Sequence, residues 1–159
     1  MTPGLRVPRS RPKENARRAR EGLYRQLILE ASAAAAEAAA GPAEMLIAAV
    51  GAYVDFFVGH PDYLRIHLRG GHAWGLAGAG SRSHSQAHAW EEGIDLYAGI
   101  FERGVGAGVF HPGPPRLLAR MMIAMQQVQL ADWVERGMQQ DPGDLVADVH
   151  AWVRRAFCR

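Results

Sequence analysis

Glycine and proline divide this chain into short segments, and inside each segment the apolar residues recur at helical spacing. The breaks are Gly41-Pro42, Gly59-His60-Pro61, Gly104 to Pro115 and Asp141-Pro142-Gly143. Proline cannot continue a preceding helix, and glycine readily ends one. In the first segment Leu23, Leu27 and Ala31 stand four residues apart, which places them on one helix face. Alanine is abundant and β-branched residues form no alternating clusters, so the sequence favours helices over strands.

This pattern predicts an all-α domain of about six helices, arranged as an antiparallel helical bundle. The predicted helices cover residues 16–40, 42–59, 62–69, 83 or 85 to 103, 115–138 and 144–158. At 159 residues the chain is long enough to bury one core without disulfides or structural metals. Residues 70–80 contain five glycines and are predicted as a loop, whose Trp74 and Leu76 pack back onto the body.

The amino-terminal segment differs from the rest in charge and composition. Residues 1–20 carry seven basic side chains and one acidic side chain, whereas the remainder carries 11 basic and 15 acidic ones. Residues 1–19 are rich in proline and arginine and poor in apolar residues, so we predict disorder there and a folded domain over residues 20–158. A basic arm of this kind can contact phosphates, and the alternative is a leader without function.

Cys158 is the only cysteine, so neither an intramolecular disulfide nor a cysteine metal site can form. No apolar stretch of signal-peptide length follows the basic start. The longest apolar run, Met45 to Gly59, is interrupted by Asp55 and is too short to cross a bilayer. We therefore expect a cytoplasmic protein without a membrane partner.

No motif of a catalytic site is found, and we expect neither an enzyme nor a cofactor. The chain has no G-x-S-x-G elbow and no P-loop, and the glycines at 104, 106 and 108 follow a predicted helix and not a strand. His84 and His88 stand four residues apart, as zinc ligands on one helix face do, but the glutamate of an H-E-x-x-H motif is absent between them. A metal- or haem-binding bundle that uses these two histidines is therefore only a minor hypothesis for the function.

The last two predicted helices are apolar on two sides. Leu118, Met122 and Met125 mark one face of residues 115–138, and Leu117, Met121, Ala124, Val128 and Ala131 mark another. On residues 144–158 the two sets are Leu145, Val149, Trp152 and Ala156, and Val146, Val153 and Phe157. A surface helix needs only one apolar stripe, so we expect a homodimer in which these two helices form a four-helix interface. The alternative is that both helices are central in the monomer.

Three stretches of the sequence resemble the TetR-type transcriptional regulators. Residues 20–27 read Arg-Glu-Gly-Leu-Tyr-Arg-Gln-Leu and are similar to the phrase that starts the fourth helix in that family. Residues 53–65 end one helix at His60-Pro61 and start the next, and residues 101–117 resemble the break before the family's last two helices. The resemblance covers residues 20–158. It implies the effector-binding and dimerisation half of a ligand-responsive regulator, with the last two helices at the dimer interface.

The resemblance also directs the choice of candidate site residues. In this family a small apolar or amphipathic effector enters a cavity among the middle helices and shifts the dimer between two arrangements. Aromatic and methionine side chains suit the lining of such a cavity. The expected lining residues are Tyr53, Phe57, Tyr63, His67, Trp90, Tyr97, Met122 and Met125. The residues expected to cross the dimer interface are Val128, Trp133, Val146, His150 and Val153.

The amino-terminal part departs from the family. Its members carry about three helices before the phrase that matches residues 20–27, including a helix-turn-helix that enters the major groove. Only 19 residues precede Arg20 here, and they lack an apolar core. We expect DNA to be bound only through an N-terminal domain missing from the chain as written, whose start we hypothesise to be mis-assigned, or weakly through the basic segment. The alternative function is a helical dimerisation module that does not bind DNA and modulates intact regulators.

Overall fold

The computed structural model describes residues 12–69 and 84–159, and within these ranges the chain is all-helical. The helices are α1 (Pro12–Glu37), α2 (Pro42–Gly59), α3 (Pro61–Arg69), α4 (His84–Gly106), α5 (Pro115–Glu135) and α6 (Pro142–Phe157). The predicted all-α fold class and the number of helices are therefore confirmed for the described residues. The predicted loop over residues 70–80, with Trp74 and Leu76, lies outside them.

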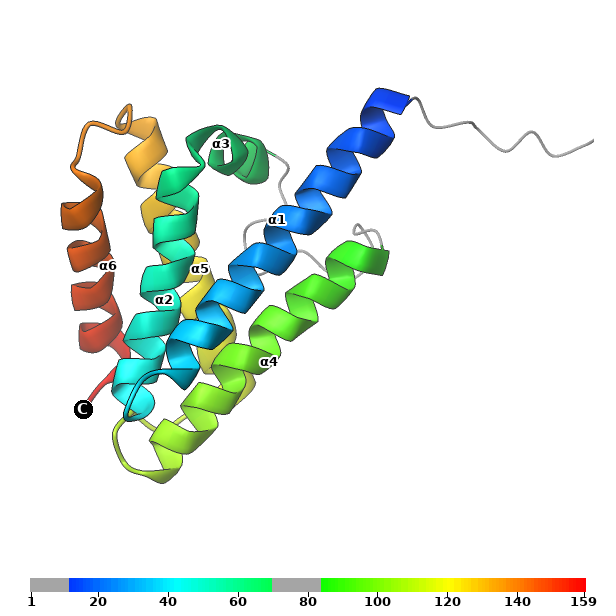
Figure 1. Cartoon of the computed structure of the whole chain (residues 1–159). Coiled ribbons are helices and arrows are strands. Elements are labelled where there is room, and N and C mark those ends of the chain that lie inside the picture. Colours follow the sequence, from blue (N-terminus) through cyan, green and yellow to red (C-terminus); the bar gives the residue numbers. More distant parts are fainter. Residues whose placement is uncertain (1–11, 70–83) are drawn as a thin grey trace, which may run out of the picture.

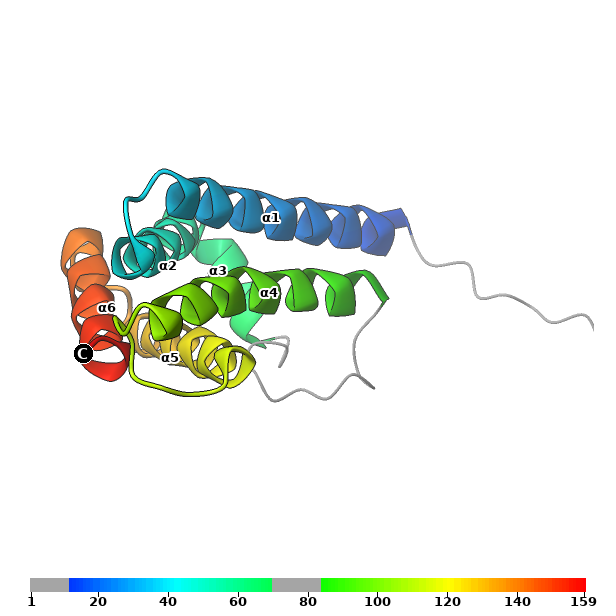
Figure 2. The same ribbon diagram turned by 90° about the horizontal axis from the view of Figure 1, so that it is seen from below.

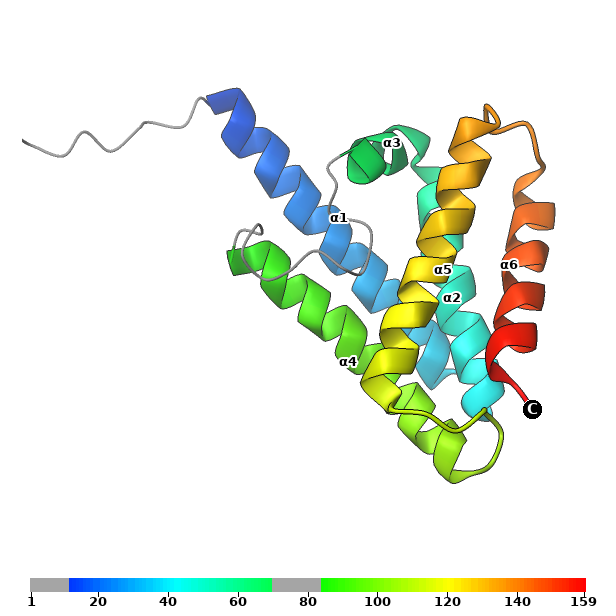
Figure 3. The ribbon, with the colours of Figure 1, turned by 180° about the vertical axis from the view of Figure 1, so that it is seen from behind.

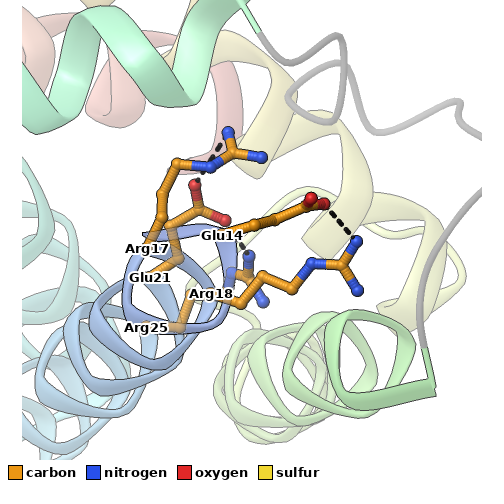
Figure 4. A network of polar contacts seen from close by, with 5 residues as sticks. All are labelled: Glu14, Arg17, Arg18, Glu21 and Arg25. Carbon is orange, nitrogen blue, oxygen red and sulfur yellow. Dashed lines mark hydrogen bonds and ion pairs between the residues drawn. The ribbon is translucent and has the colours of Figure 1, made fainter. Parts of the chain in front are cut away.

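Helix α1 begins earlier than the sequence predicts, so the expected disorder is wrong for residues 12–19. Pro12 occupies the first helical position, where its missing N–H costs no hydrogen bond. Figure 4 shows the ion pairs that follow: Arg18 Nη2 lies 2.6 Å from Glu14 Oε1, and Arg17 and Arg25 flank Glu21 at 3.6 Å. Each exposed pair at this spacing contributes only about 0.3–0.5 kcal/mol, but the pairs act together along one helix. Residues 1–11 lie outside the described part.

Helix α2 is the centre of the bundle, and it contacts each of the other five helices. α1 and α4 are inclined to α2, α5 and α6 (Figures 1 and 2), and α1 packs most closely on α2. α5 and α6 run in opposite directions on the side seen in Figure 3. The side chains that α2 buries are Leu46, Ala49, Val50, Val54 and Phe57.

By length and composition alone, α2 is apolar enough to cross a membrane, with a mean hydropathy of 1.4 over 18 residues. A third of those residues are buried in the structure, and α2 contacts each of the other five helices. The buried apolar residues of α2 thus contribute to the core of the bundle.

The ends of four helices differ from the predictions by two or three residues. α4 ends at Gly106 and not at residue 103. α1 ends at Glu37 and not at residue 40. α5 ends at Glu135 and not at Met138, because Gly137 takes a positive φ of 74° and two backbone bonds close the helix end. Met138 N–H donates to Trp133 O and Gly137 N–H to Val134 O, the Schellman pattern. α6 begins at Pro142, since the Asp141 carboxylate caps it by accepting from Gly143 N–H at 2.8 Å.

The connection between α4 and α5 closes one end of the bundle around Phe110. This ring is buried against Phe101, with centroids 5.2 Å apart, and Phe101 in turn packs on Phe157. The backbone of residues 109–111 pairs with the carboxyl terminus: His111 N–H donates to Phe157 O, and Arg159 N–H donates to Val109 O. Gly104 lies directly beneath the Phe110 ring, which leaves no room for a side chain.

We predict that Gly104→Ala destabilises the protein, because the added Cβ would overlap the Phe110 ring. Overpacking of this kind costs about 1–3 kcal/mol of the free energy of unfolding. Gly99→Ala, on the same helix, meets nothing within 4 Å and should instead stabilise the helix by about 0.5–1 kcal/mol. Urea denaturation of both variants measures the difference, and effects of the same sign would contradict this account of residue 104.

Candidate ligand-binding site in the bundle interior

The interior of the bundle holds a cluster of uncharged polar side chains, which we call the polar cluster. It consists of Ser32 of α1, Tyr53 of α2, Tyr97 of α4, and Gln126 and Gln127 of α5. The exposed fractions of Ser32, Tyr97, Gln126 and Gln127 are 3% or less. Gln126 and Ser32 both lower the pKa of the Tyr97 hydroxyl, and Gln127 and Gln126 lower that of the Tyr53 hydroxyl, so these groups are neighbours in space. The cluster thus joins four helices at the centre of the fold.

Most polar atoms of the cluster lack a hydrogen bond within the described residues. They are Ser32 Oγ, the Tyr97 hydroxyl, both amide atoms of Gln126, and Gln127 Oε1. The neighbouring groups approach these atoms without reaching hydrogen-bond geometry. A buried polar group without a partner costs about 1–3 kcal/mol. An arrangement that lowers stability in this way is typical of a site whose hydrogen bonds are completed by another molecule.

Burial keeps the two tyrosines of the cluster neutral. It raises the pKa of both Tyr53 and Tyr97 well above the ordinary value, because the phenolate loses its hydration inside the protein. Gln127 and Gln126 oppose this effect at Tyr53, as Gln126 and Ser32 do at Tyr97, but their influence is smaller than that of burial. Both hydroxyls therefore remain protonated near pH 7 and can donate a hydrogen bond.

An aromatic wall adjoins the cluster through Tyr53. The Tyr53 and Phe57 ring centroids lie 4.9 Å apart, and Phe57 stacks on Tyr63 at 5.7 Å with nearly parallel planes. The His67 ring contacts Phe57 at 5.1 Å and Tyr63 at 6.1 Å. Tyr63 is buried at the start of α3 because the short turn after α2 folds α3 back over the bundle.

The structure brings five of the eight expected lining residues together. Tyr53, Phe57, Tyr63 and His67 form the wall. Tyr97 lies near it, because Tyr53 is close enough to raise the pKa of the Tyr97 hydroxyl. Met122 is fully buried in the core one helical turn before Gln126. Trp90 and Met125 are partly buried and pack against the core. Whether a ligand occupies this region stays a prediction.

Sequence reasoning missed Ser32, Gln126 and Gln127. Gln126 stands four residues after Met122 and four before Leu130, both of which are buried on the same face of α5. A glutamine in phase with buried apolar residues is the signal that could have indicated an interior polar site. Ser32, among the alanines at the end of α1, gives no such signal.

The five residues expected at a dimer interface do not share one surface. Val128 is exposed, but Trp133 and Val153 are buried inside the chain, so the expectation that they face a partner is wrong for these two side chains. Trp133 also donates its indole N–H to Gln140 O at 3.1 Å, which fixes the ring inside the chain. Val146 is partly buried against the core. The reason is that α6 buries one stripe at four-residue spacing, to which Val153 belongs, and leaves Trp152 outside.

His150 packs between α6 and α2. Its Nε2 lies 3.0 Å from the position that a Cβ on Gly51 would take, so the two helices approach closely there. Burial lowers the pKa of His150, and Arg154 lowers it further, whereas Asp55 and the Ile47 carbonyl oppose the shift. The imidazole is therefore a half-buried packing group between two helices of the same chain.

The residues that the structure describes hold no group of three histidine, cysteine, aspartate or glutamate side chains that could bind a metal ion. His88 Nε2 lies 3.4 Å from Glu92 Oε1 on the surface of α4, while the side chain of His84 lies outside the described part.

Comparison with known proteins shows the fold alone. No family model matches the sequence, and no curated protein matches it. A solved structure of a protein with unknown function from Rhodococcus sp. RHA1 has a similar fold, with a TM-score of 0.62 and 20% sequence identity. The match covers 87% of this chain and 71% of that one.

We predict that Gln126→Leu stabilises the protein in the absence of any ligand. Leucine is similar in size and removes two buried polar atoms without partners, so the free energy of unfolding should rise by about 1–3 kcal/mol. Gln139→Leu, at an exposed position after α5, serves as the matched control and should change it by less than about 0.5 kcal/mol. Urea denaturation measures both. A clear loss of stability in the Gln126 variant would show that the amide is bonded within the protein.

Proposed function

We propose that this domain binds a small apolar or amphipathic molecule among its helices and dimerises through α5 and α6, as the sensor half of a TetR-type transcriptional regulator. The observation that carries the proposal is the polar cluster, most of whose polar atoms are buried without a hydrogen-bond partner among the described residues. The order of helices and breaks along residues 20–158 supports the assignment to that type of regulator. The DNA-binding part of such a regulator would lie outside these helices.

The chemistry of the interior suits a small-molecule site. Such sites are mostly apolar and aromatic, with a few polar groups that fix the orientation of the ligand. Here Phe57, Tyr63 and Met122 supply the apolar part, while Tyr97 and Gln126 supply the polar part. A purely structural core would gain stability from apolar side chains at the polar positions, so their presence favours a binding role.

The outer face of α5 supports dimerisation. Leu117, Met121 and Val128 are each about half exposed, and their spacing of four and seven residues places them on one face, opposite the buried one. Trp152 on the neighbouring helix α6 is exposed to the same extent. α5 and α6 lie as an antiparallel pair on one side of the molecule (Figure 3), the arrangement from which two copies build a four-helix interface.

Helix α5 offers a direct route from ligand to dimer. Its inner face carries Gln126 and Gln127, and its outer face carries Met121 and Val128. A ligand that binds one position of α5 more tightly than another changes the affinity of the dimer. Dimerisation then changes the affinity for the ligand by the same free energy. This coupling is the property that a sensor domain requires.

We predict that Val128→Glu converts the protein from dimer to monomer, because it places a charge at the centre of the proposed interface. Leu23→Glu is the matched control, since Leu23 is equally exposed but lies on α1. Sedimentation equilibrium at micromolar concentration gives the mass of each variant. A monomeric parent protein, or a monomeric Leu23 variant alone, would contradict the proposed interface.

We also predict saturable binding of the uncharged fluorescent probe N-phenyl-1-naphthylamine, with one site per chain. At saturation, the dissociation constant of the dimer should change by about fivefold or more, the usual size of coupling between two sites. Fluorescence titration and sedimentation measure the two quantities. Binding without saturation would indicate only surface adsorption and would contradict an interior site.

A further inference from the structure

The polar cluster contains no ionisable acid or base other than its two tyrosines. Within the described residues, the pKa of Tyr53 responds to burial, to the two glutamines and to Tyr63, and that of Tyr97 to burial, Tyr53, Gln126 and Ser32. No described lysine, arginine, aspartate or glutamate is among the groups that shift the pKa of either hydroxyl. Tyr63, at the edge of the wall, differs because two charged side chains influence its pKa: Arg25 lowers it and Glu21 raises it. The centre of the site is therefore polar but uncharged.

Gln126 is the best-placed recognition group of this cluster. Its side chain is fully buried, and neither Nε2 nor Oε1 has a hydrogen-bond partner in the described part of the chain. One atom donates and the other accepts, and the two lie side by side on a planar amide. The complementary group presents one acceptor and one donor in the same plane, as another carboxamide does. The Tyr97 hydroxyl lies close to this amide, and Ser32 Oγ lies close to that hydroxyl, so the hydroxyl can donate to the remaining lone pair of such a group.

We propose that the interior site selects an uncharged ligand that pairs a carboxamide-type group, such as a primary amide or a lactam, with Gln126. The apolar body of this ligand packs against Phe57 and Tyr63. This inference rests on the proposed function, because it specifies what the same site binds. His67 belongs to the aromatic wall through its contacts with these two rings.

Ionised ligands fit this site poorly. A carboxylate only accepts hydrogen bonds, so it would leave Gln126 Oε1 without a donor and would bring a buried negative charge beside no described cation. An ammonium group only donates, so it would leave Gln126 Nε2 without an acceptor and would face no described carboxylate. The neutral amide satisfies both atoms and introduces no charge.

The test is calorimetric titration of the full chain with three probes of equal length at pH 7.5: octanamide, octanoate and octylammonium. Octanamide should bind at least about tenfold more tightly than either ion, since each ion leaves one buried atom of Gln126 unpaired. Gln126→Leu should weaken octanamide binding by about tenfold and reduce, but not abolish, the preference for octanamide, because the charge of either ion would still be buried. Gln139→Leu should leave all three affinities unchanged, and thermal unfolding confirms that each variant is folded.

The outcomes separate this inference from the proposed function. If octanoate or octylammonium binds as tightly as octanamide, the selection of uncharged ligands is wrong, although an interior site remains. If Gln126→Leu binds octanamide as the parent does, the pairing with Gln126 is wrong. If N-phenyl-1-naphthylamine saturates one site but none of the octyl probes binds, the inference about the carboxamide group is wrong and the proposed function stands. If neither that probe nor any octyl compound binds, the proposed function fails as well.

Discussion

Burial of the apolar helix α2 is the constraint on which the rest of this structure depends. Its composition would suit a membrane-spanning helix, and the fold meets the same requirement by placing every other helix against it. The hydrophobic effect stabilises this arrangement in proportion to the apolar surface area that is removed from water. The breaks at Gly41-Pro42 and His60-Pro61 matter for the same reason, because they return α1 and α3 to the surface of α2. In this arrangement Phe57 meets Tyr63 of the following helix α3, and Tyr53 meets residues of α4 and α5 that are distant in sequence.

The interior that results is apolar except where the polar cluster lies, and this exception bears on function. Glutamine, serine and tyrosine at the centre of a bundle lower its stability when their hydrogen bonds are incomplete, as they are here for Gln126, Tyr97 and Ser32. Stability therefore does not explain these residues, whereas the proposed recognition of a small molecule would. Because the cluster draws on α1, α2, α4 and α5, a molecule bound there would contact most of the elements whose positions define the bundle.

Helix α5 combines two surfaces with different physical roles. The inner surface, with Met122 and Leu130 on either side of Gln126, is fixed by the core. The outer surface retains half-exposed apolar side chains that nothing in the described part of the chain covers. A rigid helix transmits a displacement from one surface to the other, which is why a bound molecule and a second copy of the chain can influence each other in the proposed sensor. In α6, by contrast, Val153 and its partners at four-residue spacing are used entirely within the chain.

Local sequence signals sufficed for the helical class, the number of helices in the described ranges and most helix ends, because proline, glycine and apolar spacing act over a few residues. They did not suffice at the start of α1, where the composition of residues 12–19 suggested disorder but the chain is helical and carries ion pairs along the helix. Aromatic candidates such as Tyr53, Phe57 and Tyr63 could be selected from the sequence, but their contact could not. Two features were decided only by tertiary packing. These are the choice of the buried face of α6 and the meeting of Gln126 and Ser32 at the Tyr97 hydroxyl. Helical periodicity gives the faces of a helix, whereas the neighbours of each face depend on how all six helices cross.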